Sequence, residues 1–211
     1  MTKPFSVSNF IAKLVSIVFH PLLIPTWAYV LLVNFGEPLE HEQSFFWEWL
    51  NGVYIFLATF VIPSLVFVVL LKLKFIGSLS MPDRQERNLP ILITAIFFYL
   101  SFYLFQQLGL DAVFGLYMLG ATVLALLSML INYWWKISLH LLGAGGLTGA
   151  VATLSLYFSP TYFVVLPIVV LLSGVIAFSR LKLNAHTQSE VYVGYALGFV
   201  VIFGFFGMMV G

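Results

Sequence analysis

The sequence has 211 residues, of which 62% are apolar and only 8% are charged, whereas a soluble domain carries about 25% charged residues. The mean hydropathy is +1.06 and several apolar runs exceed about 18 residues, which predicts a polytopic helical membrane protein and excludes a soluble domain. The formal net charge is +1, and there is no cysteine. Disulfides, thiolate metal sites and cysteine nucleophiles are therefore excluded.

The apolar runs predict an all-α bundle of six to seven transmembrane helices. Residues 1–19 begin polar and become amphipathic, so we expect an interfacial N-terminal helix that leads into the bilayer. Pro63 lies inside the second run, and we expect it to kink that helix. No long linker interrupts the runs, which indicates one membrane domain over residues 1–211. The expected helices cover about Pro21–Phe35, Leu50–Leu73, Ile91–Leu108, Ala112–Trp134, Leu139–Phe158, Tyr162–Phe178 and Val191–Val210.

Charged residues are segregated between the two faces of this predicted bundle. The loops after the second, fourth and sixth helices lie on one face with the N-terminal segment, and this face holds all nine Lys and Arg residues. The opposite face carries the acidic segment 37–48. Three short loops from distant parts of the chain therefore bring their polar groups together at one membrane face.

The stretch Ser179–Glu190 lies between two long apolar runs and holds four ionisable side chains: Arg180, Lys182, His186 and Glu190. A helix that continues from about Ala185 places His186 and Glu190 one turn apart on the same face. The carboxylate then holds one imidazole nitrogen and leaves the other as a nucleophile or base. Arg180 offers a planar fork suited to phosphate oxygens. This pattern predicts a phosphate-ester site at a membrane surface.

Cleavage of a phosphate ester requires cations around the non-bridging oxygens, a nucleophile in line with the leaving group, and an acid. We expect His186, oriented by Glu190, to attack phosphorus. We expect His140 to protonate the departing alkoxide. The expected phosphate-binding side chains are cationic or hydroxylic: Arg180, Lys136, Ser138, Arg84 and Arg87.

Two of these segments resemble signatures of the type 2 phosphatidic acid phosphatase superfamily. Ser179-Arg180, five residues, His186, three residues and Glu190 are similar to the third signature, which ends in Asp instead of Glu. The segment 136–140 is similar to the second signature, Pro-Ser-Gly-His. The first signature, Lys followed seven positions later by Arg-Pro, is not matched, and the segment 83–87 stands in its place.

The resemblance implies a phosphohistidine intermediate on His186, a general acid at His140 and no metal or other cofactor. It also implies a lipid phosphate or diphosphate as substrate, such as a polyprenyl diphosphate or a phosphatidate. The implied partners are this substrate and membrane lipids, without nucleic acid, and the oligomeric state is left open.

The membrane face of the site and the activity of the protein each have an alternative interpretation. Charge counting places the basic face in the cytoplasm, whereas the resemblance implies a site that faces the periplasm, the exterior or a lumen. We expect the non-cytoplasmic site, in a bacterial inner (plasma) membrane. A lipid phosphotransferase and a non-catalytic lipid-phosphate binder or transporter are the alternative functions. A metal site of His140, His186 and Glu190 is less favoured because the nearby cations oppose a metal ion.

Other polar and small residues have structural interpretations. We expect His20 and His41 to be interfacial, and Lys72, Lys74 and Lys182 to set topology or meet lipid headgroups. The glycine pairs Gly145–Gly149 and Gly194–Gly198 predict close packing of two membrane helices.

Overall fold

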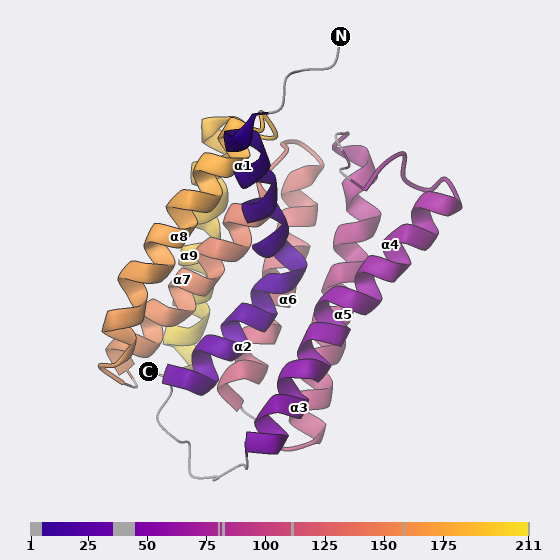
Figure 1. Ribbon diagram of the computed structural model, residues 1–211. Coiled ribbons are helices and arrows are strands. Elements are labelled where there is room, and N and C mark those ends of the chain that lie inside the picture. The colour runs from indigo at the N-terminus through magenta and orange to yellow at the C-terminus, as the bar shows by residue number, and fades with distance from the viewer. Residues whose placement is uncertain are drawn as a thin grey trace.

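The computed structural model describes residues 6–35, 45–79, 81, 83–110, 112–157 and 159–210. The chain forms a bundle of helices that run roughly side by side (Figure 1). This confirms the predicted polytopic helical membrane protein. In the described part of the chain, the six helices long and apolar enough to cross a membrane are Phe46–Lys72, Gln85–Gln107, Ala112–Asn132, Leu139–Tyr157, Tyr162–Lys182 and Gln188–Met208.

The first span is a broken helix. α1 (Val7–Val18) is followed by a short 3-10 turn, η1 (Pro21–Leu23), and by α2 (Ile24–Phe35), with a bend of 42° between the two halves. Pro21 has no N–H and a fixed φ, so it cannot extend α1. The two halves taken as one span give the seventh crossing. α1 packs along α8 (Tyr162–Lys182), and its location at the membrane interface stays a prediction.

The second span contains an irregular turn before its proline. α3 (Phe45–Phe56) passes through a π-helical turn, η2 (Leu57–Val61), into α4 (Ile62–Lys72). A π-helical turn accommodates backbone that cannot form the regular hydrogen-bond ladder, and Pro63 lacks the N–H which that ladder needs. The distortion expected at Pro63 is therefore located in the turn that precedes it.

The remaining helices lie close to the predicted ranges, with one error that concerns the site. They are η3 (Gln85–Arg87), α5 (Asn88–Gln107), α6 (Ala112–Asn132), α7 (Leu139–Tyr157), α8 and α9 (Gln188–Val210). α8 continues four residues beyond Phe178, so Arg180 lies in its last turn. The helix expected from Ala185 is wrong, because α9 begins only at Gln188 and His186 lies in the turn before it.

The turns α4–α5, α6–α7 and α8–α9 lie at the same end of the bundle as the start of α1 (Figure 1). The convergence of three distant loops at one face is thereby confirmed. His41 and residues 37–44 of the acidic segment fall outside the described residues.

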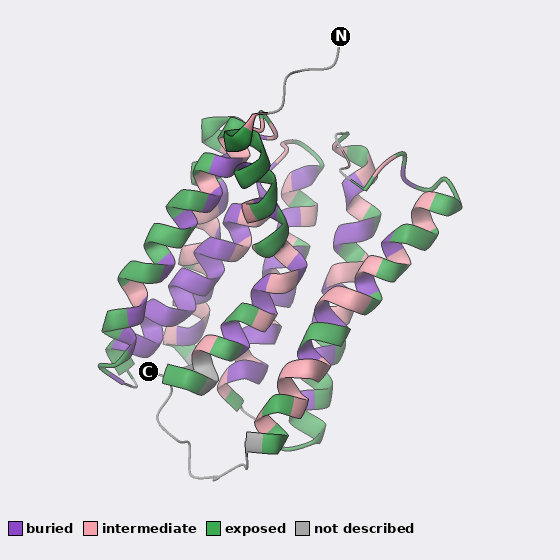
Figure 2. Ribbon diagram, viewed as in Figure 1, coloured by how far each residue is buried: buried purple, intermediate pink, exposed green. Residues whose placement is uncertain are grey.

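α7 is the central helix of the bundle. Buried residues make up 83% of its apolar window, against 28–50% for the other five spans (Figure 2). The predicted close packing through glycines is confirmed at its contact with α9. A Cβ on Gly198 would overlap the carbonyl oxygen of Leu142, and one on Gly145 would overlap that of Tyr195. The two backbones therefore meet where no side chain separates them.

We expect Gly198→Ala to lower the free energy of unfolding by about 1–3 kcal/mol, because the new methyl group meets backbone that cannot rotate away. The measurement is thermal or denaturant unfolding of the purified protein in detergent micelles. Gly204→Ala is the matched control on the same helix, since a Cβ there has no neighbour within 4 Å. Equal stability of the two variants would contradict the packing described for α7 and α9.

Candidate functional site

The turn that carries His186 begins with a Schellman motif at the end of α8. The N–H of Ala185 donates to the carbonyl oxygen of Arg180 at 3.1 Å, and that of Asn184 donates to Leu181 at 3.0 Å. Asn184 has a φ of +50°, a left-handed conformation that asparagine tolerates better than most residues. The chain is thereby reversed directly after Arg180, and His186 follows within the same turn.

α9 then begins with a capping box. The N–H of Glu190 donates to Oγ1 of Thr187 at 3.4 Å, and the N–H of Thr187 donates to Oε2 of Glu190 at 3.2 Å. A carboxylate in the first turn of a helix is also favoured by the helix dipole. The N–H groups of Thr187 and Glu190, which lack helical partners at the helix start, each gain an acceptor in this way. The carboxylate of Glu190 is thereby fixed beside His186, the residue before Thr187.

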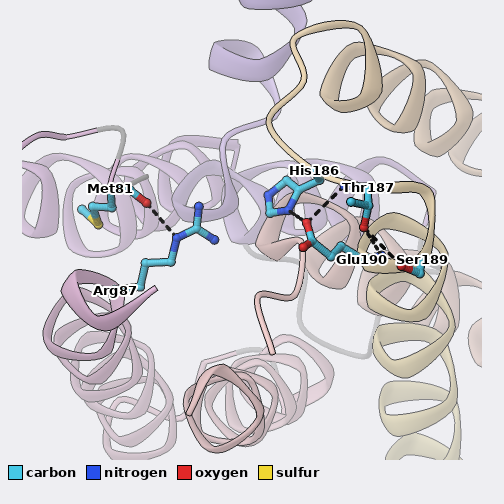
Figure 3. A network of polar contacts seen from close by, with 6 residues as sticks. All are labelled: Met81, Arg87, His186, Thr187, Ser189 and Glu190. Carbon is cyan, nitrogen blue, oxygen red and sulfur yellow. Dashed lines mark hydrogen bonds and ion pairs between the residues drawn. The ribbon is translucent and has the colours of Figure 1, made fainter. Parts of the chain in front are cut away.

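The same carboxylate holds His186. Nδ1 of His186 lies 2.7 Å from Oε2 of Glu190 (Figure 3). Because a carboxylate accepts, the hydrogen is on Nδ1 and Nε2 carries the lone pair. The predicted pairing is therefore present, although it arises across a helix start instead of within a helix.

Electrostatics keep His186 neutral. His186 is only 8% exposed, and this burial lowers the pKa of its imidazole to about 4. The charges of Arg87 and Arg180 lower the pKa further, while the hydrogen bond to Glu190 opposes both effects. At neutral pH the contact is thus a hydrogen bond from a neutral imidazole to a carboxylate, and Nε2 is available as a nucleophile.

Arg87 faces His186 from the other side of the site. It precedes α5, is 8% exposed, and donates from Nε to the carbonyl oxygen of Met81 at 2.9 Å. Its guanidinium points toward the imidazole of His186 (Figure 3). Nδ2 of Asn132 fastens this turn to the end of α6, because it donates to the Arg84 carbonyl and to Oδ1 of Asn88, each at 2.7 Å.

His140 contacts the broken first span. Its Nε2 lies 3.0 Å from the carbonyl oxygen of Ser16, so the ring donates from Nε2 to the end of α1. The ring of His20 packs edge-on against it, with a centroid distance of 5.6 Å. His20 was expected to be an interfacial residue; the structure places its ring beside that of His140, and its position in the membrane stays a prediction.

These groups share one cavity of about 480 Å³. Its polar end is formed by histidine and arginine, and the remainder is lined mainly by apolar side chains of α1, α2, α4, α5, α6, α7 and α9. The cavity therefore suits an amphiphilic ligand, because its lining is cationic at one end and apolar at the other. The polar end comprises His20, Arg87, His140, Arg180 and His186, and the apolar part includes Ile24, Phe67, Phe98, Tyr117 and Leu124.

Three predicted phosphate-binding residues do not line this cavity. Arg84 contributes its backbone carbonyl to Asn132. Ser138 donates its N–H to the carbonyl of Glu190 at 3.2 Å, and its hydroxyl is buried without a hydrogen-bond partner. Lys136 is half-buried, and its pKa is lowered by burial and by Arg87 and Arg180, against the opposing charges of Glu190 and Asp83.

The structure brings together His186, His140, Arg180 and Arg87 in the cavity wall, with Glu190 directly behind His186. Sequence reasoning missed His20 and Asn132. Pro21, directly after His20, indicated a helix break there and was the signal that could have identified His20. No sequence pattern indicated Asn132. Among the described residues, no three or more His, Asp or Glu side chains are grouped to hold a metal ion.

The cations of the cavity have no carboxylate partner. Within the described ranges, the ion pair present is that of His186 with Glu190, and neither Arg87 nor Arg180 lies within 4.0 Å of a carboxylate oxygen. Nε of Arg180 is buried without a hydrogen bond. Charged groups at membrane depth are costly unless something compensates them, so this arrangement favours an anionic ligand.

Comparison with protein families, with curated proteins and with solved structures finds no match for this chain.

We expect the imidazole of His186 to titrate with a midpoint near pH 4 in the folded protein, below its ordinary value of 6.5. The unfolded chain then binds more protons between these values, so the free energy of unfolding falls as the pH drops through this window. Glu190→Gln should lower the midpoint further, because the hydrogen bond and the negative charge of Glu190 both raise it.

The measurement is an NMR pH titration of labelled histidines, with the signal assigned through His186→Gln. Glu48→Gln provides a control carboxylate outside the cavity. A midpoint near 6.5, or one that Glu190→Gln raises, would contradict the described environment.

Proposed function

We propose that this protein is an integral-membrane phosphatase that hydrolyses a lipid phosphate or diphosphate through a phosphohistidine on His186. The observation that carries the proposal is the neutral His186, held by Glu190 through Nδ1 with Nε2 free, at the cationic end of an amphiphilic cavity. A lone pair fixed in this way attacks phosphorus. The resemblance of the segments 136–140 and 179–190 to two phosphatase signatures supports the same reaction.

The two arginines supply the electrostatic part of the reaction. Arg87 and Arg180 converge on the cavity from η3 and α8, and neither has a carboxylate partner in the described part of the chain. Guanidinium groups bind phosphate oxygens in two-pronged geometry and stabilise the charge that develops on them. Their unused hydrogen-bonding capacity supports a phosphate group between them and His186.

The apolar part of the cavity supports a lipid as the substrate. Aromatic and aliphatic side chains of α1, α2, α4, α5, α6, α7 and α9 line it, and such a wall offers no hydrogen bonds to a free phosphate ion. A polyprenyl or acyl chain placed there has its headgroup at the arginines.

The reaction proceeds in two steps. Nε2 of His186 attacks phosphorus, the bond from phosphorus to the leaving oxygen breaks, and His140 gives that oxygen a proton. Water then cleaves the phosphohistidine, and its proton goes to His140. No metal or other cofactor takes part.

One observation favours a second candidate, a non-catalytic lipid-phosphate binder or transporter. The described N–H of His140 donates to the Ser16 carbonyl, and Lys136 and Ser138 lie outside the cavity wall. Such a protein binds a lipid phosphate without turnover, and its binding survives His186→Ala. A phosphotransferase uses the same intermediate with an alcohol in place of water, and product analysis with added acceptors separates it from a phosphatase.

His186→Ala should abolish phosphate release from every lipid phosphate that the wild type hydrolyses, a loss of about 10⁴-fold or more because the nucleophile is removed. The measurement is phosphate release from a panel of phosphatidate, lysophosphatidate and polyprenyl diphosphates by the purified protein in mixed micelles. Glu48→Gln, on the opposite side of the bundle, serves as the control and should match the wild type. Wild-type protein without turnover on the whole panel, or full activity in His186→Ala, would remove the proposal.

The site is proposed to face the non-cytoplasmic side of a bacterial inner membrane. We expect a cysteine introduced between residues 37 and 44 to be protected from a membrane-impermeant thiol reagent in intact cells. The same substitution should react after the cells are opened. A cysteine in place of Lys74, at the site end of the bundle, is the matched control and should react with the reagent in intact cells. Labelling of the 37–44 position from outside would place the site in the cytoplasm, as charge counting does.

A further inference from the structure

The end of α1 leaves one carbonyl group without its helical partner. In a continued helix the carbonyl of Ser16 accepts from the N–H of His20, but that N–H donates to Ile17 at 3.2 Å instead. The last carbonyls of a helix need partners from elsewhere. Nε2 of His140 supplies the donor, at 3.0 Å. The break in the first span therefore creates the acceptor that orients the ring of His140.

His20 stabilises this break by one hydrogen bond and by the packing of its ring against two others. Its Nδ1 accepts the N–H of Leu22 at 3.3 Å and so caps the turn η1, which Pro21 begins without an N–H of its own. Its ring packs edge-on against His140, at 5.6 Å and 80°, and against Phe60, at 6.3 Å and 68°. One side chain thus fixes both the chain direction after α1 and one side of the His140 imidazole.

This arrangement determines which nitrogen of His140 delivers a proton. With Nε2 fixed on a backbone carbonyl, the second proton of the imidazolium is on Nδ1. The C-terminal end of α1 also carries partial negative charge, which favours a cation beside it. The other charged or titratable groups that line the cavity are His20, Arg87, Tyr117, Arg180 and His186, and the two arginines oppose that proton.

We propose that His20 is a positioning residue for the proton donor: it holds the break between α1 and η1, so that the Ser16 carbonyl orients His140 with Nδ1 available to the leaving oxygen. The proposal rests on the proposed phosphatase function. His20 lies about 120 residues from the signature-like segment that contains His140, and nothing in those segments assigns it a role. No covalent step is added, because the proton transferred is the one that His140 already gives.

The test exploits the dependence of the reaction on its leaving group. An alkyl phosphate needs a proton donor for the departing oxygen, whereas a nitrophenyl phosphate leaves without one. His20→Asn keeps an acceptor for the N–H of Leu22 and loses the ring, and His20→Phe keeps a ring and loses the acceptor. We expect both variants to lower kcat on a lipid alkyl phosphate by about ten- to a hundredfold, with KM within about twofold and activity on a nitrophenyl ester of the same chain retained.

Trp27→Phe is the matched control for general loosening of the bend. Nε1 of Trp27 donates to the carbonyl of Val18 at 2.9 Å, so this variant also removes a hydrogen bond from the end of α1 without contact to His140. It should leave the ratio of alkyl to nitrophenyl activity unchanged. An equal loss on both substrates in the His20 variants, or no loss on either, would overturn the positioning role.

A second measurement separates this proposal from the function on which it rests. Nitrogen-15 NMR of histidine-labelled protein reports which ring nitrogen carries hydrogen. In the wild type we expect the neutral ring of His140 to be the Nε2–H form, with Nδ1 protonated only in the imidazolium that gives the proton, and in His20→Phe we expect a mixture of the two neutral forms. Wild-type protein without turnover would remove the phosphatase and with it the role in proton donation, whatever the tautomer. Turnover with the Nδ1–H form at His140, or with an unchanged tautomer in His20→Phe, would overturn the positioning role alone.

Discussion

The hydrogen bond between His186 and Glu190 depends on how α9 begins. Glu190 is the last residue of the capping box Thr187–Glu190, and its carboxylate accepts from the N–H of Thr187 and from Nδ1 of His186 through the same oxygen. A side chain in that position must extend back past the helix start, and glutamate is longer than aspartate by one CH2 group. This requirement gives a physical reason for Glu where the resembling signature has Asp. The same carboxylate therefore caps the start of α9 and orients the imidazole of His186.

Close packing of α7 on α9 transmits this arrangement to the second half of the site. A Cβ on Gly194 would lie 2.9 Å from the carbonyl oxygen of Ser138, and the N–H of Ser138 donates to the carbonyl of Glu190. The first turn of α7 is thereby fixed against the first turn of α9. His140, two residues after Ser138, comes to the same cavity as His186. Glycines at the helix contact therefore serve the geometry of the cavity as well as bundle stability.

The sequence predicted the fold class, the ranges of most helices and the shared face of three loops, because apolar runs and charge segregation are strong signals in a membrane protein. It also paired His186 with Glu190, from their spacing. It did not predict how the pair forms, since a Schellman motif at Asn184 and a capping box together replace the expected helix. The contact of His20 with the ring of His140 was not predicted, because the two residues are 120 positions apart in sequence. Burial and hydrogen bonding, which spacing does not reveal, separate Arg87 from Arg84 and exclude Lys136 and Ser138 from the cavity wall.

The central claim is that a neutral His186 accepts a phosphoryl group at Nε2. The most direct measurement is mass spectrometry of the peptide 183–190 after brief exposure of the purified protein to a lipid phosphate and an alkaline quench, which preserves phosphohistidine. The account predicts a phosphoryl group on His186 that acid removes and that excess unlabelled substrate chases into free phosphate. Turnover of the substrate without any phosphoryl group on this histidine would contradict it.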